Sequence, residues 1–262
     1  MEQRYSSPAS YMAESAVSGA EQVSGADAKH PPSYFEAQTP HGDLAMRYTE
    51  LLLAGKRREA GDLIVAALDE PGSTLTVKDI YLHVFQPALY EIGRLWQLNV
   101  ISVAEEHLFT AATQLVMSRL YPRIFTSERK PYSMVAACVD DELHEVGVRM
   151  VTDFFEMNGW DTTYLGANMP QDAIVHAVQE RRPDILAISL TMSYRLHAVS
   201  EILKRVRDDE SCRGVKVLVG GYCFRAFPDL WKRVGADGYA ADAAAAIAKA
   251  EQLVRSKSSV AK

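Results

Sequence analysis

The second half of the chain repeats one pattern five times, a short apolar run followed by an amphipathic stretch. This alternation is typical of a parallel β-sheet with helices on both faces. We therefore predict an α/β domain over residues 133–256, folded as a flavodoxin-like, doubly wound sheet of five parallel strands. Such sheets bind ligands at the carboxyl ends of their strands. The apolar runs are residues 134–139, 162–165, 185–190 and 215–219, and a short run near Tyr239.

The preceding stretch, residues 41–126, has helical periodicity instead. Four segments with short links predict a small antiparallel four-helix bundle. Two of them begin with a capping-box pattern that Asp79 and Glu105 complete, and Pro87 is expected to kink the third. The four segments are 44–54, 58–68, one that begins at Thr76 and one that begins at Ser102.

Three parts follow from these patterns. Residues 1–40 are rich in Ser, Ala, Gly, Pro and Glu with little periodicity, so we predict a disordered tail. Residues 41–126 form the helical bundle, and a linker at 127–132 leads to the flavodoxin-like domain.

Composition excludes several classes of protein. The net charge is −6 with charges mixed along the chain, and this gives no basic surface for nucleic acid. No apolar run has the roughly 18 residues of a membrane-spanning helix. Three widely spaced cysteines make neither a disulfide framework nor a metal knuckle, so we expect a cytoplasmic protein.

The loop after the first predicted strand carries the strongest candidate residues. It reads Asp-Asp-Glu-Leu-His-Glu-Val-Gly over residues 140–147. Glu142 stands two residues before His144, and a carboxylate beside a metal-bound His fixes its tautomer and raises its basicity. Gly147 would let the next helix begin close to a bulky ligand. A solvated acidic loop with an incidental surface His is the alternative.

Two more short patterns follow at the ends of later strands. Forty-one residues separate Gly147 from Ser189-Leu190-Thr191, and 28 residues separate Thr191 from Gly220-Gly221. Adjacent glycines leave room beside the sheet, although an ordinary strand-end turn also uses them.

Together these three patterns resemble cobalamin-binding modules such as that of methionine synthases, which carry Asp-x-His-x-x-Gly, Ser-x-Leu and Gly-Gly at the same spacing. Glu142 replaces the Asp and Thr191 the Leu, and Glu is usual in light-sensing regulators of the CarH/LitR type. The resemblance implies that His144 is the lower axial ligand of cobalt, with Glu142 acting through it. The displaced tail of the cofactor would then pass Ser189 and Gly220-Gly221.

The bundle carries a second resemblance to CarH/LitR proteins. Trp96 is followed by nine residues and then Glu106-His107. In those proteins this pattern faces the upper side of the corrin and its adenosyl group. A core Trp and a solvated helix start are the alternative. Those proteins have a His after the Trp, whereas this chain has Gln97, which puts the light chemistry or the upper ligand in doubt.

Three functions remain open at this stage: a light or redox sensor, a corrinoid carrier of methyl groups, and a mutase or synthase subunit. No catalytic barrel is present, so we expect no enzyme. The Trp-Glu-His pattern with Glu142 favours a stand-alone sensor of the AerR/PpaA antirepressor type, which binds a transcription factor and does not contact nucleic acid or membrane. Expected cofactors are adenosylcobalamin or hydroxocobalamin. Heme or a bilin remains an alternative or additional tetrapyrrole, and a homo-oligomer remains open.

Overall fold

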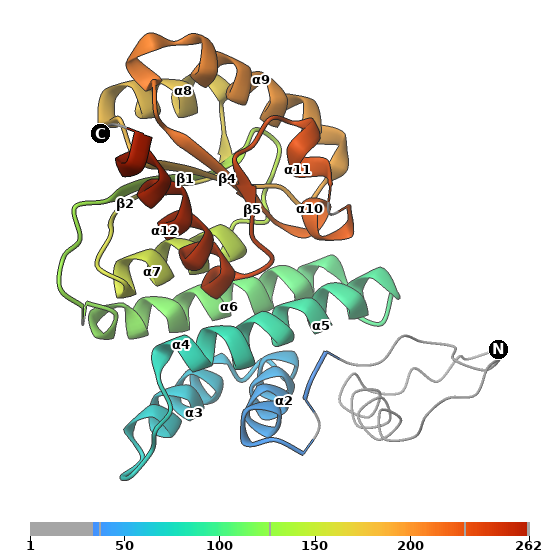
Figure 1. Cartoon of the computed structure of the whole chain (residues 1–262). Helices are drawn as coiled ribbons and strands as arrows, with labels where there is room; N and C mark the ends of the chain where they lie inside the picture. Colours follow the sequence, from blue (N-terminus) through green and yellow to red (C-terminus); the bar gives the residue numbers. More distant parts are fainter. Residues whose placement is uncertain (1–33, 37, 126, 228, 261–262) are drawn as a thin grey trace, which may run out of the picture. The chain divides into compact units, whose positions relative to one another are not determined.

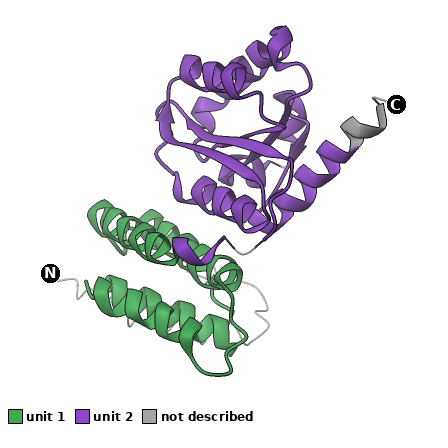
Figure 2. Ribbon diagram, turned by 90° about the vertical axis from the view of Figure 1, so that its left-hand side faces the viewer, with its two compact units in different colours: residues 1–120 green, residues 121–262 purple. Residues whose placement is uncertain are grey.

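The structure is a computed structural model that describes residues 34–36, 38–125, 127–227 and 229–260, with side chains to Arg255 (Figure 1). The predicted tail lies almost wholly outside the described residues. The chain divides into two compact units, residues 1–120 and 121–262 (Figure 2). Among the described helices, none combines the length and apolarity that crossing a membrane requires.

The first unit contains the predicted helices. Both expected capping boxes are present, because Thr76 exchanges hydrogen bonds with Asp79 and Ser102 exchanges them with Glu105. Tyr48 is fully buried at the centre of the unit, where its ring meets Phe109 edge-on. The helices are α2 (Pro40–Leu53), α3 (Arg57–Asp69), α4 (Val77–Asp79), the π-helix η2 (Ile80–Phe85), α5 (Gln86–Gln97) and α6 (Val103–Leu120).

The third predicted helix is continuous from α4 to α5 but widens into a π-helix just before Pro87. Proline has no N–H to donate to the preceding turn. The chain adapts by hydrogen bonding over five residues, with the amide of Gln86 donating to the carbonyl of Tyr81. A π-turn therefore accompanies the proline.

The second unit is a five-stranded sheet with the order β2-β1-β3-β4-β5, and every neighbouring pair is parallel. This is the predicted flavodoxin-like topology. The second strand is longer than its alternation suggested. The strands are β1 (Ser133–Val139), β2 (Asp161–Met169), β3 (Ile185–Ser189), β4 (Lys216–Gly220) and β5 (Gly238–Tyr239).

Helices cover both faces of the sheet, as the alternation of strands and helices predicted (Figure 1). On one face lie α7 (Val146–Met157) and α12 (Ala243–Val260). The other face carries α8 (Gln171–Arg181), α9 (Leu196–Asp208), α10 (Tyr222–Ala226) and α11 (Leu230–Arg233). Alternate side chains of each central strand enter one of the two cores. The short 3₁₀ helices η3 (Tyr121–Arg123), η4 (Ser193–Arg195) and η5 (Glu210–Cys212) complete the unit.

Candidate functional site

The predicted loop after β1 holds His144 against a buried carboxylate. Glu142 is fully buried, whereas half of the His144 side chain is exposed. Glu142 Oε1 lies 2.5 Å from His144 Nδ1 and also accepts a hydrogen bond from the His144 amide at 3.0 Å. Because Nδ1 faces Glu142, a metal ion would be ligated through Nε2.

The second carboxylate oxygen of Glu142 joins this loop to the loop after β3. Oε2 accepts hydrogen bonds from the amides of Thr191 (2.7 Å) and Met192 (3.0 Å). Burial by itself would raise the pKa of Glu142, but these hydrogen bonds and those from His144 outweigh it and lower the pKa to about 2. The carboxylate is therefore ionised at neutral pH and stabilises the His144 tautomer that carries a proton on Nδ1.

Arg195, in η4, makes a second connection between the same two loops. Its Nε donates to the carbonyl of Asp140 at 2.9 Å, and its guanidinium pairs with the carboxylates of Asp140 and Asp141. At the other end of the loop, just before α7, Glu145 Oε2 accepts hydrogen bonds from two residues of β2, the Tyr164 hydroxyl (2.8 Å) and the Ala167 amide. Contacts on both sides thus fix the loop that carries His144.

Three small residues stand in one row at the carboxyl edge of the sheet. The strand register pairs Cys138 with Ser189, and Ser189 with Gly220. The thiol of Cys138 donates to the carbonyl of His144 at 3.6 Å. Burial, and next the charge of Glu142, raise the pKa of this thiol.

The row borders the core beneath α7 and α12, which combines several alanines with larger side chains such as Leu218 and Phe155. A ligand tail inserted at this edge would displace little side-chain bulk. The small residues of the row and of this core are Ala136, Cys138, Ala187, Ser189, Gly220, Ala240, Ala246 and Ala250.

The predicted glycines divide into two kinds. A Cβ on Gly147 would meet no atom within 4 Å, so the fold itself leaves open space beside the start of α7. Gly221 has φ +93°, and a Cβ there would lie 2.4 Å from the carbonyl oxygen of Leu190. Gly221 is therefore required by the backbone, whereas the need for Gly147 is not explained by packing within the chain.

Several exposed apolar side chains belong to β2 or follow strands that end at the same edge of the sheet as β1. Surface hydrophobic residues concentrated in one region mark a binding surface more often than scattered ones do. They come from β2 and from the segments that follow β1, β3 and β4, including η4 and α10, and they are Leu143, Tyr164, Met192, Tyr194, Tyr222 and Phe227.

Trp96, Glu106 and His107 belong to the first unit, at the connection between α5 and α6. Trp96 is 42% exposed near the end of α5. Glu106 accepts from Thr110 and lies 2.6 Å from Nδ1 of the exposed His107. The turn between the helices is closed by the Asn99 amide, which donates to the Trp96 carbonyl.

Sequence reasoning missed several residues of the site. Arg195 gave no signal, because its partners lie 55 residues earlier in the chain. Tyr164 was placed in a strand without a role. The alanine run at 243–246 could have been noticed, since small residues at a helix start allow close approach to a sheet.

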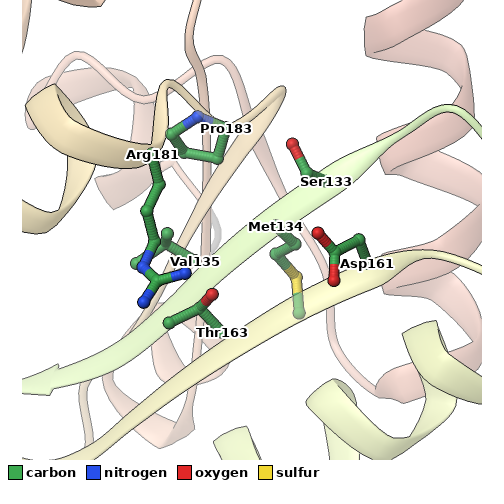
Figure 3. Close-up of a pocket in the computed structure, with 7 residues that line it drawn as sticks. All are labelled: Ser133, Met134, Val135, Asp161, Thr163, Arg181 and Pro183. Atoms are coloured by element: carbon green, nitrogen blue, oxygen red, sulfur yellow. The ribbon is translucent and has the colours of Figure 1, made fainter.

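A separate pocket of about 220 Å³ lies at the amino-terminal end of β1 and β2, opposite the His144 loop (Figure 3). Its lining mixes strand residues with Arg181 and Pro183 from the end of α8. None of the predicted site residues belongs to it. It is lined by Ser133, Met134, Val135, Asp161, Thr163, Arg181 and Pro183.

The donors present suit one kind of metal centre. Over the described residues, no three His, Cys, Asp or Glu side chains are grouped to hold a metal ion. A tetrapyrrole supplies the equatorial ligands of its metal, so one axial imidazole is sufficient. The half-exposed His144, the open space at Gly147 and the row of small residues fit a corrinoid.

Two family models match the chain in tandem. One, described as a B12 binding domain, matches residues 132–248, and another, also described as a B12 binding domain, matches residues 44–121. The two matches correspond to the sheet unit and the helical unit.

Individual relatives are distant. The chain is 27% identical over 196 residues to the HTH-type transcriptional repressor CarH of Myxococcus xanthus, covering 74% of this chain but only 63% of the repressor. It is 24% identical over 226 residues to dimethylamine corrinoid protein 1 of Methanosarcina mazei, covering 84% of this chain and all of that protein.

A solved structure shares the fold. The Methanosarcina barkeri monomethylamine corrinoid protein superposes with a TM-score of 0.69 at 19% identity. The match covers 80% of this chain and 98% of that one.

Proposed function

Given that the chain is a cobalamin-binding protein with a helical and a flavodoxin-like B12 binding domain, we propose that His144 Nε2 is the lower axial ligand of the cobalt. The contact between Glu142 and His144 Nδ1 carries this proposal, because it orients the ring and favours a neutral, ligating Nε2. Ser189, Thr191, Gly220 and Gly221 would border the cofactor tail.

The upper side of the corrin is proposed to meet residues of the bundle. Trp96 offers a broad apolar surface, and Glu106 and His107 offer hydrogen-bonding groups. A bound corrinoid supplies a cobalt ion whose upper ligand responds to light or redox state. We propose that the chain uses this response as a sensor: it would act by binding a protein partner, such as a transcription factor, and not by catalysis or contact with nucleic acid.

A methyl-carrying role is the second candidate, and it is supported by the similarity to a dimethylamine corrinoid protein. The chain spans all of a dimethylamine corrinoid protein but only 63% of the repressor CarH. The sensor role is supported instead by the conjunction of Glu142 with the Trp96, Glu106 and His107 pattern. For the cofactor, the small-residue row favours a tailed corrinoid over heme, which has no tail, and leaves an additional bilin open.

One experiment separates these functions. The purified full chain is mixed in the dark with adenosylcobalamin or hydroxocobalamin and desalted, and its absorbance and oligomeric state are recorded before and after green light. His144→Ala is compared with His176→Ala, an exposed His of α8. We expect retained cobalamin with a spectrum that changes in light and that only His144→Ala alters.

The other outcomes are equally informative. Cobalamin that is retained but inert to light would support the carrier. Loss of all corrinoid on desalting, or identical spectra for wild type and His144→Ala, would overturn the proposed role of His144 and direct attention to heme or a bilin.

A further inference from the structure

We propose that Arg195 is a positioning residue that holds the His144 loop in its metal-ligating conformation. This inference rests on the proposed role of His144 as lower ligand. It assigns to Arg195 no contact with the cofactor, only an action through Asp140 and Asp141.

The contacts of Arg195 are directed at one loop. Its Nε binds the Asp140 carbonyl, and its two terminal nitrogens face the carboxylates of Asp140 and Asp141. The Arg195 side chain is only 15% exposed. A planar guanidinium can reach a carbonyl and two carboxylates at once, which a lysine ammonium cannot do with the same geometry.

The charge of the loop explains why a cation is needed there. Four carboxylates, Asp140, Asp141, Glu142 and Glu145, fall within six residues. Like charges at such spacing repel, most strongly where burial lowers the local dielectric. Arg195 pairs with two of them and offsets part of this repulsion.

The backbone of Arg195 belongs to the same connection. Its amide donates to the Met192 carbonyl, closing the turn that presents the Thr191 and Met192 amides to Glu142. The two loops are therefore joined reciprocally. Glu142 of the first loop binds amides of the second, while Arg195 of the second binds a carbonyl and carboxylates of the first. His144 follows the connected residues of the first loop in sequence and is bound to Glu142.

The test measures cobalamin affinity in the dark by calorimetry on the full chain, with the absorbance signature of lower-ligand binding recorded for each complex. Arg195→Met is compared with Arg195→Lys. Arg205→Met serves as the matched control, since Arg205 lies on α9 and forms an exposed pair with Asp172. Hydrogen exchange of the amides of residues 142–145 is followed without cofactor.

We expect Arg195→Met to weaken binding about tenfold, the size seen when outer partners of a metal ligand are removed, and to shift the spectrum toward that of His144→Ala. Exchange in the loop should accelerate. The cobalamin affinity of Arg195→Lys should lie between those of wild type and Arg195→Met, and the affinity of Arg205→Met should match that of wild type. An unchanged affinity and spectrum for a folded Arg195→Met protein would overturn the inference.

A double-mutant cycle with Asp140→Asn separates action through the loop from direct contact with the cofactor. If Arg195 acts through Asp140, the double variant binds no more weakly than Arg195→Met alone. If the losses of the two single variants add, Arg195 acts independently of the Asp140 carboxylate, which contradicts the proposal. If wild type and His144→Ala share one spectrum, the ligand role fails first, and that failure is recognised without any Arg195 variant.

Discussion

At the scale of single residues, Glu142 combines complete burial with an ionised state. Its four hydrogen bonds come from His144 and from two amides of another loop. A buried charge without such partners would cost several kcal/mol. The Glu142 side chain therefore stabilises the fold as well as supporting the proposed ligation. The contribution to folding can be measured by itself in the cofactor-free protein.

The acid sensitivity of the cofactor-free protein reports the folding contribution. Because the pKa of Glu142 is lowered from 4.5 to about 2 in the folded chain, its stabilisation is complete above about pH 4.5 and is lost as the pH falls toward 2. The stabilisation that is lost when Glu142 becomes fully protonated is about 3 kcal/mol. Urea unfolding at a series of pH values should show wild type losing stability relative to Glu142→Gln across this window. If the difference in unfolding free energy between wild type and Glu142→Gln does not change with pH, the lowered pKa of Glu142 does not contribute to stability.

Two of the predicted glycines, Gly147 and Gly221, are needed for different reasons, one for a ligand and one for the backbone. Gly221→Ala should destabilise the cofactor-free protein by about 1–3 kcal/mol, because φ is +93° and Leu190 blocks the Cβ. Gly147→Ala should leave it as stable or up to about 1 kcal/mol more stable, because the site is open and helical. Its cobalamin affinity should nevertheless fall. Unfolding curves and calorimetry measure both effects. Unchanged affinity in Gly147→Ala would mean that the open space is not used.

At the scale of elements, the type and order of helices and strands followed from hydrophobic periodicity, while some boundaries did not. The alternation of β2 ended at Leu165, yet the strand continues to Met169. Gly166 has φ +89° and Asn168 φ +52°, and the register with β1 shifts there. Such irregularities break the period of two but keep the pairing with a neighbour, which a single sequence does not reveal.

The capping box of α6 gives an element-scale prediction. Ser102→Ala removes the hydrogen bond to the Glu105 amide and should lower the free energy of unfolding by about 1 kcal/mol. Ser118→Ala on the same helix is the control, because its hydroxyl bonds back to the Gln114 carbonyl, a contact that adds little to helix stability. Equal losses in both variants, measured by urea unfolding, would argue against a specific cap.

At the scale of the whole molecule, every motif residue after the linker lies in one unit. The spacing of His144, Ser189 and Gly220 predicted this site because the strands are parallel and their carboxyl ends meet at one edge. The reciprocal contacts of Glu142 and Arg195 could not be predicted, since they depend on side-chain packing between segments about 50 residues apart.

Because these motif residues lie in one unit, we expect the second unit to fold and bind cobalamin without the first. It contains both cores of the sheet, on its two faces. A fragment of residues 121–262 should therefore fold and bind cobalamin with a lower-ligand spectrum that His144→Ala abolishes, whereas residues 1–120 alone should retain none. If Trp96, Glu106 and His107 cover the upper side, the fragment should bind more weakly and its spectrum should respond differently to light. Identical affinity and light response in fragment and full chain would leave the bundle without a role in cofactor binding.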